Sequence, residues 1–255
     1  MTNVIAVPAL RDNYVWLVIG NDDHCAVVDP GEAPPVLEEI RQRGLTLDAI
    51  LITHHHPDHQ GGVDALLAHR EVPVYGPADE SIQYRTHALS EGDIVRLDNL
   101  GVDFEVLETP GHTAGHISYY GAGLLFCGDT LFAGGCGRLF EGTPEQMVHS
   151  LGKLAALPPE TQFFAGHEYT ESNLRFAAQV EPDNEPLQER LERVTALRSH
   201  GHPTLPGTLG EELRTNPFLR CGVEDVKQSA EKHAGKRLPS AVEVFAAVRA
   251  WKDAN

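Results

Sequence analysis

Cysteine is scarce in this chain. The 255 residues include four, far apart at Cys25, Cys127, Cys136 and Cys221. They form no paired-ligand spacing, so neither a zinc ribbon nor a disulfide framework is expected. We interpret each as a small packed apolar residue, and a reducing cytoplasm is the simplest location for such a chain.

Positive charge is also in short supply. Lys and Arg number 20 against 37 Asp and Glu, which gives a formal net charge of −17 at pH 7. A nucleic-acid partner would need an excess of Lys and Arg on one face, so no such partner is expected. The same charge would slow the approach of an anionic small molecule unless a local group of cations offsets it.

Long apolar runs are absent too. No run is long enough to span a bilayer, and residues 1–20 lack the basic start and the long apolar centre of a signal peptide. We therefore expect no membrane partner and no targeting segment. The length allows a large core, in one domain or in a domain with an appendage.

Short apolar segments separated by turn residues fill most of the chain. Their patterns predict an antiparallel start to a sheet, followed by alternating strands and short helices. The expected strands cover 4–7, 14–19, 25–28, 49–52, 72–75, 94–107, 117–120, 124–127 and 163–165. The expected helices cover 34–43, 63–70, 144–157, 186–200 and 240–251. The first should end at Gly44, and capping boxes at Thr143 and Ser240 should begin the third and the fifth. Because the composition changes near residue 170, we expect an α/β domain over residues 1–170 and a helical domain over 171–255.

The densest group of polar residues follows the apolar run 49–52 and reads Thr-His-His-His-Pro-Asp-His over residues 53–59. A ligand-rich loop at the end of a buried strand is rigidly held. If the chain is still extended there, alternation points the His54 and His56 rings to one side, where they can chelate one ion. His55 would then point away.

Pro57 turns the chain, so Asp58 and His59 emerge in a different direction and suggest a second ion. The alternative interpretation is a polar loop with a fortuitous histidine cluster. Four metal-type donors within six residues rarely arise from composition alone, which favours the metal site.

Three later residues resemble the donors of this cluster, because each is a possible metal ligand that follows an expected strand and stands beside glycine. They are His112, Asp129 and His167. Individually such residues are more often structural, and a Gly-Asp pair is usually a turn. Together they supply what the cluster lacks, since two ions need about four protein donors each, with room left for water. Seven residues are enough if Asp129 bridges the ions.

At this point the sequence resembles the metallo-β-lactamase superfamily and, within it, the glyoxalase II (hydroxyacylglutathione hydrolase) family. The resemblance covers nearly the whole chain. It rests on residues 53–59, 109–116, 128–132, 134–138, 166–170 and 216–218. The first of these motifs is shared across the superfamily, whereas the glycine-rich loop 134–138 and the helical tail are far more particular.

The resemblance implies an α/β fold, a four-layered αββα sandwich with the site at one edge of its two sheets, followed by an all-helical domain. It implies two divalent metal ions, most simply zinc, although the same donors suit iron and manganese. One ion would be held by His54, His56 and His112 and the other by Asp58, His59 and His167, with Asp129 and a hydroxide bridging them. Asp58 and Asp129, with that hydroxide, would be the catalytic groups.

The charge balance of such a centre supports hydrolysis. Two divalent ions bring four positive charges, and two aspartates with one hydroxide remove three, so the centre stays positive and lowers the pKa of bound water to about 7. A thiolate whose conjugate acid has a pKa of about 8.5 departs with little proton donation. This suits the substrate that the resemblance implies, S-D-lactoylglutathione, which is split into D-lactate and glutathione.

The resemblance also implies contacts to the glutathione part. Arg138, Arg249 and Lys252 would bind its glycine end, and Tyr169 would add a contact. Phe140 stands where some members have tyrosine, so a hydroxyl hydrogen bond is missing there. From the sequence alone, Arg249 and Lys252 would be surface charges that the helix dipole favours at a helix end.

Rival functions remain on the same fold, which also hosts other hydrolases such as β-lactamases and lactonases. A persulfide dioxygenase would use a single iron and consume oxygen, and a nuclease is disfavoured by the acidic charge. A metal-binding redox module would be expected to substitute a carboxylate in the first cluster and to add a flavin domain. His116 is interpreted as a packing or orienting residue. We expect a monomer that acts on a small molecule.

Overall fold

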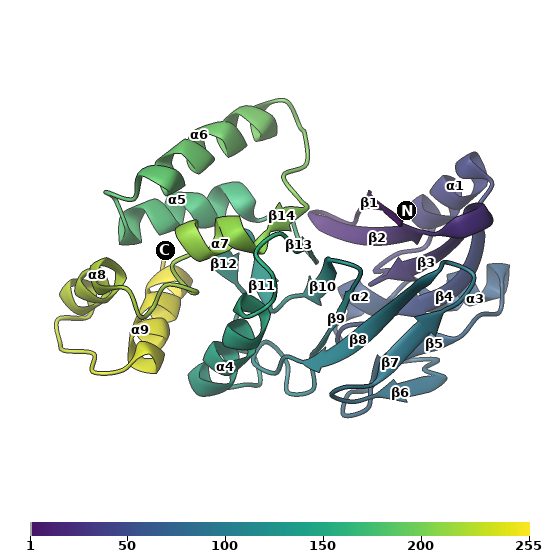
Figure 1. Cartoon of the computed structure of the whole chain (residues 1–255), viewed down its shortest axis with the longest axis horizontal. Coiled ribbons are helices and arrows are strands. Elements are labelled where there is room, and N and C mark those ends of the chain that lie inside the picture. Colours follow the sequence, from purple (N-terminus) through teal and green to yellow (C-terminus); the bar gives the residue numbers. More distant parts are fainter. Residues whose placement is uncertain (1) are drawn as a thin grey trace. The chain divides into compact units, whose positions relative to one another are not determined.

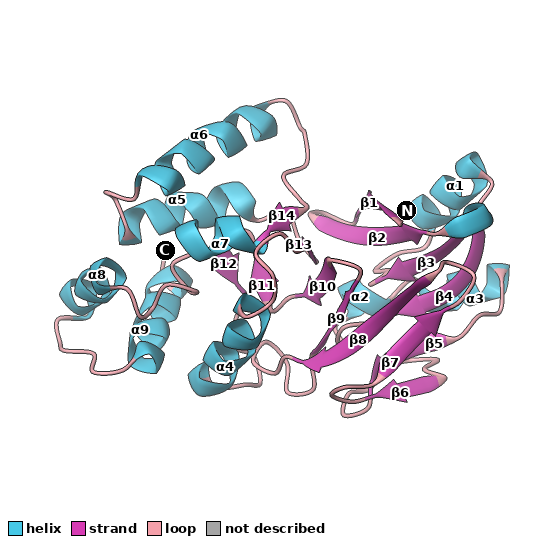
Figure 2. Ribbon diagram, in the orientation of Figure 1, coloured by secondary structure: helices cyan, strands magenta, loops and turns pink. Residues whose placement is uncertain are grey.

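The computed structural model describes residues 2–255, which divide into two compact units. The first unit runs to Glu108 and resumes over Thr113–Gly128, and the second comprises Thr109–His112 and Asp129–Asn255. Figure 1 shows their elements in chain order and Figure 2 separates helices from strands. The domain boundary expected near residue 170 stays a prediction.

The first unit begins with a six-stranded sheet in the order β1-β2-β3-β4-β5-β6. Strands β1 to β3 pair antiparallel and strands β3 to β6 pair parallel, which confirms the antiparallel start. Their bounds are β1 (Asn3–Ala9), β2 (Asn13–Ile19), β3 (His24–Val28), β4 (Thr46–Leu51), β5 (Val74–Pro77) and β6 (His87–Leu89). The predicted strand 72–75 is therefore shifted by two residues.

The helices of the first unit are η1 (Asn21–Asp23), α1 (Pro34–Arg43), α2 (Pro57–Gln60) and α3 (Val63–His69). The prediction for α1 is confirmed in full: it ends at Gly44, whose φ of 67° lies in the left-handed region that glycine enters without strain. Helix α3 is one residue shorter than predicted.

Both faces of this first sheet are buried along its central strands. Val15 and Leu17 of β2 belong to the core that includes residues of α1 and α3. Trp16, between them, points to the opposite face and is only 2% exposed. On that side the Tyr119 hydroxyl, in the second sheet, donates a hydrogen bond of 2.8 Å to the Ile52 carbonyl at the end of β4. The donor loop that follows β4 therefore leaves a strand covered on both sides.

The second sheet contributes four strands to the first unit, in the order β10-β9-β8-β7. Their bounds are β7 (Ile94–Leu97), β8 (Val102–Glu108), β9 (Ile117–Gly121) and β10 (Leu124–Gly128), and neighbours pair antiparallel. The single strand predicted over 94–107 is wrong, because a tight turn splits it into a hairpin. The turn ends at Gly101, whose amide donates to the Leu97 carbonyl and whose φ is 69°.

The second unit is mainly helical. Its elements are β11 (Leu131–Phe132), β12 (Gly135–Cys136), α4 (Pro144–Ala155), β13 (Gln162–Ala165), α5 (Thr170–Val180), α6 (Glu185–Ser199), β14 (Gly207–Thr208), α7 (Leu209–Thr215), α8 (Glu224–Ala234) and α9 (Ala241–Asp253). Capping boxes begin α4 at Thr143 and α9 at Ser240, as predicted. Helices α5 and α8 were not predicted, and neither has a side-chain cap at its N-terminus to mark it.

A buried ion pair anchors the glycine-rich loop of this unit. The Arg190 guanidinium donates to the Glu212 carboxylate, and both side chains are at most 3% exposed. The same carboxylate accepts hydrogen bonds from the Gly134 amide at 2.8 Å and from the Asn216 side chain at 2.9 Å. Removing one partner of such a pair would leave a buried charge uncompensated, which is strongly destabilising. The pair therefore fixes the Glu212 carboxylate, and the carboxylate fixes the loop through the Gly134 amide.

Each helix in the described part of the chain is too short or too polar to cross a membrane.

Candidate metal centre

The first donor cluster lies in the loop after β4 and in the single turn of α2. His54 and His59 are at most 1% exposed. The nearest ring nitrogens of His54 and His56 are 3.1 Å apart, and Nε2 of His59 lies 3.6 Å from Oδ2 of Asp58. Four donors from six consecutive residues thus gather within the first unit.

Asp29, which directly follows β3, orients two of these histidines. Its carboxylate accepts hydrogen bonds from the Thr53 amide at 2.8 Å and from the Thr53 hydroxyl at 2.7 Å, and it lies 3.0 Å from Nδ1 of His59. The Thr53 hydroxyl oxygen is in turn 3.0 Å from Nδ1 of His54. Because the hydroxyl proton goes to Asp29, His54 donates from Nδ1. His59 does the same towards the carboxylate, so in both rings Nε2 is the nitrogen left for a metal.

In the sequence, Asp29 marks only the end of an expected strand. A signal for its role exists in the structure, since its φ is 52°, a conformation that is uncommon outside glycine and that gathers at functional sites. The residue reaches across 24 positions to Thr53. Such a long-range contact has no counterpart in the local sequence pattern.

His55 lies against Glu80. The Glu80 carboxylate accepts a hydrogen bond of 2.5 Å from the His55 amide and is 3.0 Å from the His55 Nδ1 atom. It also accepts from the Thr113 hydroxyl and, at 3.1 Å, from the Gly115 amide. This carboxylate, which the sequence pattern does not predict, joins the first donor loop to the loop that precedes β9.

His116 stacks on His54, with ring centroids 4.8 Å apart and an interplanar angle of 24°. The space beside it requires glycine at Gly128. A Cβ atom there would lie 2.3 Å from the Thr53 hydroxyl oxygen and 2.7 Å from Nε2 of His116, and the φ of Gly128 is 46°. The packing around His54 is therefore closed on this side.

The second donor set lies in the second unit. His112, Asp129 and His167 are each at most 6% exposed. Nε2 of His112 and Nε2 of His167 are both 3.4 Å from Oδ2 of Asp129. Two donors bound to one ion at about 2.1 Å in a tetrahedral shell stand about 3.4 Å apart. The distance from Asp129 to each histidine nitrogen therefore fits a carboxylate that shares a metal ion with that histidine.

Backbone groups fix the second set. Nδ1 of His112 lies 2.9 Å from the Arg138 carbonyl oxygen and donates to it, which leaves Nε2 towards Asp129. Gly137 permits this approach, because a Cβ atom there would lie 1.9 Å from the Asp129 carbonyl oxygen. The glycine-rich loop thus positions the histidine through its backbone.

Aromatic rings surround the second set. Tyr169 stacks on His167 with ring centroids 4.7 Å apart and an interplanar angle of 4°, and Phe132 meets both rings edge-on. Phe140 is 63% exposed, and its ring lies 5.2 Å from that of His112. The two predicted aromatic contact residues therefore each adjoin a predicted metal ligand.

The three predicted substrate cations gather around the end of α9. Arg249 is only 5% exposed, so its interpretation as a surface charge is wrong. Its Nη1 donates to the Cys136 carbonyl at 3.0 Å. Arg138 is exposed and lies 3.5 Å from Asp253. Lys252 donates to the Asn173 side chain, and burial, followed by the nearby Arg249, lowers the pKa of Lys252 to about 8.

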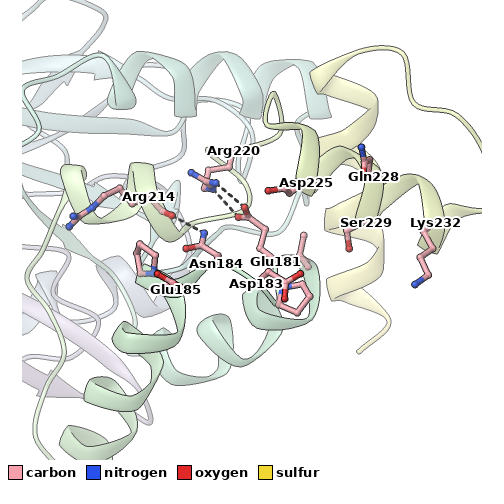
Figure 3. Close-up of a pocket in the computed structure, with 13 residues that line it drawn as sticks. Glu181, Asp183, Asn184, Glu185, Arg214, Arg220, Asp225, Gln228, Ser229 and Lys232 are labelled. Atoms are coloured by element: carbon pink, nitrogen blue, oxygen red, sulfur yellow. Dashed lines mark hydrogen bonds and ion pairs between the residues drawn. The ribbon is translucent and has the colours of Figure 1, made fainter.

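A separate polar cavity of about 750 Å³ lies among α5, α6, α7 and α8 (Figure 3). Its most buried charge, Glu181, is paired with Arg220 through two hydrogen bonds of 2.8 Å. Asn184 faces the cavity while its side chain caps α6 and donates to the Arg214 carbonyl. None of the predicted site residues lines this cavity.

Comparisons with known proteins cover nearly the whole chain. The family model of the metallo-beta-lactamase superfamily matches residues 9–167, and that of the hydroxyacylglutathione hydrolase C-terminus matches residues 168–255. Proteins named hydroxyacylglutathione hydrolase from Alkalilimnicola ehrlichii and Pseudomonas fluorescens are 56% and 54% identical, with 99% of each chain covered.

Solved structures agree with the fold. ETHE1 from Myxococcus xanthus aligns with a TM-score of 0.65 and 26% identity over 100% of this chain and 99% of that one. TTHA1623 in a di-iron-bound form aligns with a TM-score of 0.60 and 30% identity over 85% of this chain and 100% of that one. With its α/β metallo-β-lactamase fold and its helical C-terminal part, the chain belongs to the hydroxyacylglutathione hydrolase family of the metallo-β-lactamase superfamily.

Proposed function

We propose that this chain hydrolyses the thioester S-D-lactoylglutathione to D-lactate and glutathione. The observation that carries the proposal is the similarity over the full length to proteins named for this reaction, combined with the presence of all seven predicted donors. In the reaction, water adds across the thioester: a C–O bond forms, the C–S bond breaks, and the sulfur leaves with the electron pair and takes a proton.

The donor sets support a binuclear metal site. His54, His56 and His112 would hold one ion, Asp58, His59 and His167 the other, and Asp129 would be shared. Bound divalent ions would supply a water with a pKa lowered to about 7 and a Lewis acid for the thioester carbonyl. Zinc is the simplest choice, but histidine and aspartate suit iron and manganese too, and the relative TTHA1623 is described in a di-iron-bound form.

The protein's own groups prepare this site. The Asp29–Thr53 pair holds His54 and His59 as donors from Nδ1, and the Arg138 carbonyl does the same for His112. A ring fixed in this way leaves Nε2 as the nitrogen that can bind a metal when the ring is neutral. Asp58 and Asp129 bring the two negative charges that the proposed ions require.

We assign recognition of the glutathione part to the second unit. Arg138, Arg249 and Lys252 would pair with the glycine carboxylate, and they supply the local positive charge that a chain of net charge −17 needs to attract an anion. Tyr169 would contribute through its hydroxyl. Phe140 would offer only an apolar surface, because it has no hydroxyl to donate.

The deciding experiment is hydrolysis of S-D-lactoylglutathione, followed by thioester loss and thiol release, with metal content measured on the same sample. Rapid turnover that a chelator abolishes and added metal restores is expected. Absence of turnover with two ions bound would contradict the proposed substrate but agree with the proposed metal site. Oxygen uptake with glutathione persulfide would then identify the rival dioxygenase.

The helical region 171–255 as a substrate-binding domain, the monomeric state and the cytoplasmic location remain predictions.

A further inference from the structure

A carboxylate stands among the three cations assigned to the substrate. Oδ1 of Asp253 accepts a hydrogen bond of 3.0 Å from Nη2 of Arg249 and lies 3.5 Å from Nε of Arg138. Asp253 is the last residue of α9, where the helix dipole disfavours negative charge. The two guanidinium groups, rather than the helix, therefore stabilise the carboxylate in this place.

Arg249 is held without Asp253. Its Nη1 donates to the Cys136 carbonyl, and its guanidinium carbon lies 5.1 Å from the centre of the Phe218 ring. The Arg249 side chain is 6% exposed, whereas that of Asp253 is 42% exposed. Loss of the carboxylate would leave the guanidinium fixed, and the carboxylate itself can turn out to water.

We propose that Asp253 is an internal counter-ion that occupies Arg138 and Arg249 and is replaced by the carboxylate of the substrate. This inference rests on the proposed function, in which these cations receive the glycine carboxylate of glutathione. Each edge of a guanidinium presents a fixed fork of donors that matches one carboxylate. Two carboxylates on one guanidinium edge also repel each other, so Asp253 lowers the affinity for the substrate and acts as a specificity-determining residue.

Asp253 can weaken binding only of a ligand that carries a charged carboxylate at its glycine end. Replacing it by asparagine removes the competitor and leaves Arg138 without its carboxylate partner, so binding of a glycine carboxylate should tighten. A ligand whose glycine carboxylate is esterified would gain nothing. The measurement belongs at pH 6.5, because the pKa of Lys252 is lowered to about 8 and the lysine is then charged in both proteins.

The test is calorimetric titration of the metal-loaded wild-type protein and of the Asp253→Asn variant, with glutathione and with glutathione ethylated at the glycine carboxylate. We expect Asp253→Asn to lower the Kd of glutathione about three- to fivefold, the size of a partly exposed ion pair, and to leave that of the ester unchanged. Glu189→Gln removes an exposed carboxylate elsewhere in the same unit and controls for net charge.

Three results would overturn the inference: unchanged or weaker glutathione binding by Asp253→Asn, an equal gain with the ester, or no glutathione binding by either protein. Turnover of S-D-lactoylglutathione on the same samples separates the two proposals. Tighter glutathione binding without turnover would sink the proposed reaction alone. Turnover with a KM that Asp253→Asn leaves unchanged would sink the counter-ion alone.

Discussion

The two donor sets are built in opposite ways. In the first unit, four donors come from the consecutive stretch 53–59, and the neighbouring strand β4 holds them all. In the second unit, His112, Asp129 and His167 come from three separate loops spread over 56 residues. The first set can be identified from the sequence pattern alone. The second can be identified only in the folded structure, where Nε2 of His112 and Nε2 of His167 each lie 3.4 Å from Oδ2 of Asp129.

Removal of the shared carboxylate should have the largest effect. Asp129→Ala deletes the oxygen next to both His112 and His167, so we expect both ions to be lost or greatly weakened and hydrolysis to fall by more than about a thousandfold. Metal analysis and thioester hydrolysis on one sample check this. Two bound ions and full activity in the variant would show that Asp129 is structural.

Loss of one donor from residues 53–59 should lower the metal content less than loss of Asp129. His54→Ala should release one ion and abolish nearly all hydrolysis, by more than the roughly 100-fold that loss of a supporting partner costs. The matched control is His55→Ala, because His55 is the next residue but lies against Glu80. Equal metal loss in both variants would refute the assignment of donors within the stretch.

The supporting carboxylate should have an intermediate effect. Asp29→Asn keeps the shape of the residue but weakens its hold on Thr53 and His59, so metal affinity should fall about 10- to 100-fold. Competition with a chelator of known affinity measures this. Activity at saturating metal should largely return, and failure to return would mean that Asp29 does more than orient ligands.

Loss of the cations proposed to bind the substrate should change substrate binding rather than the chemical step. Replacing Arg249 and Lys252 together by alanine should raise KM for the glutathione thioester about tenfold and leave the metal content intact. Steady-state kinetics with metal analysis tests the split. A fall in kcat alone would exclude these residues as contacts to the carboxylate.

The pH dependence of KM should show the smallest change. Because burial lowers the pKa of Lys252 to about 8, the lysine is charged below that pH and neutral above it. KM should therefore rise a few-fold, about the worth of one partly exposed ion pair, as pH passes through 8. The Lys252→Arg variant stays charged and should lose this rise, which steady-state kinetics between pH 6.5 and 9 can detect.

Patterns of short range were predicted well. Helix α1 with its Gly44 terminus and the capping boxes of α4 and α9 are confirmed, because a cap depends on residues within one turn. The strand expected over 94–107 was wrong because the prediction followed the apolar residues across the turn, although Asp98, Asn99 and Gly101 are turn-forming residues that mark it. The roles of Asp29 and Glu80 went unpredicted, since their partners lie 24 or more residues away along the chain.

By itself, the sequence determined the chemistry: which donors exist, that four of them are adjacent, and which family the motifs resemble. Chain connectivity alone places those four donors together. The tertiary structure alone decided that Arg249 is buried, that Asp29 fixes two imidazole rings, and that Asp253 lies between Arg138 and Arg249. Each of these depends on at least one contact of 3.5 Å or less between segments far apart in the sequence, and a local pattern carries no information about such distances.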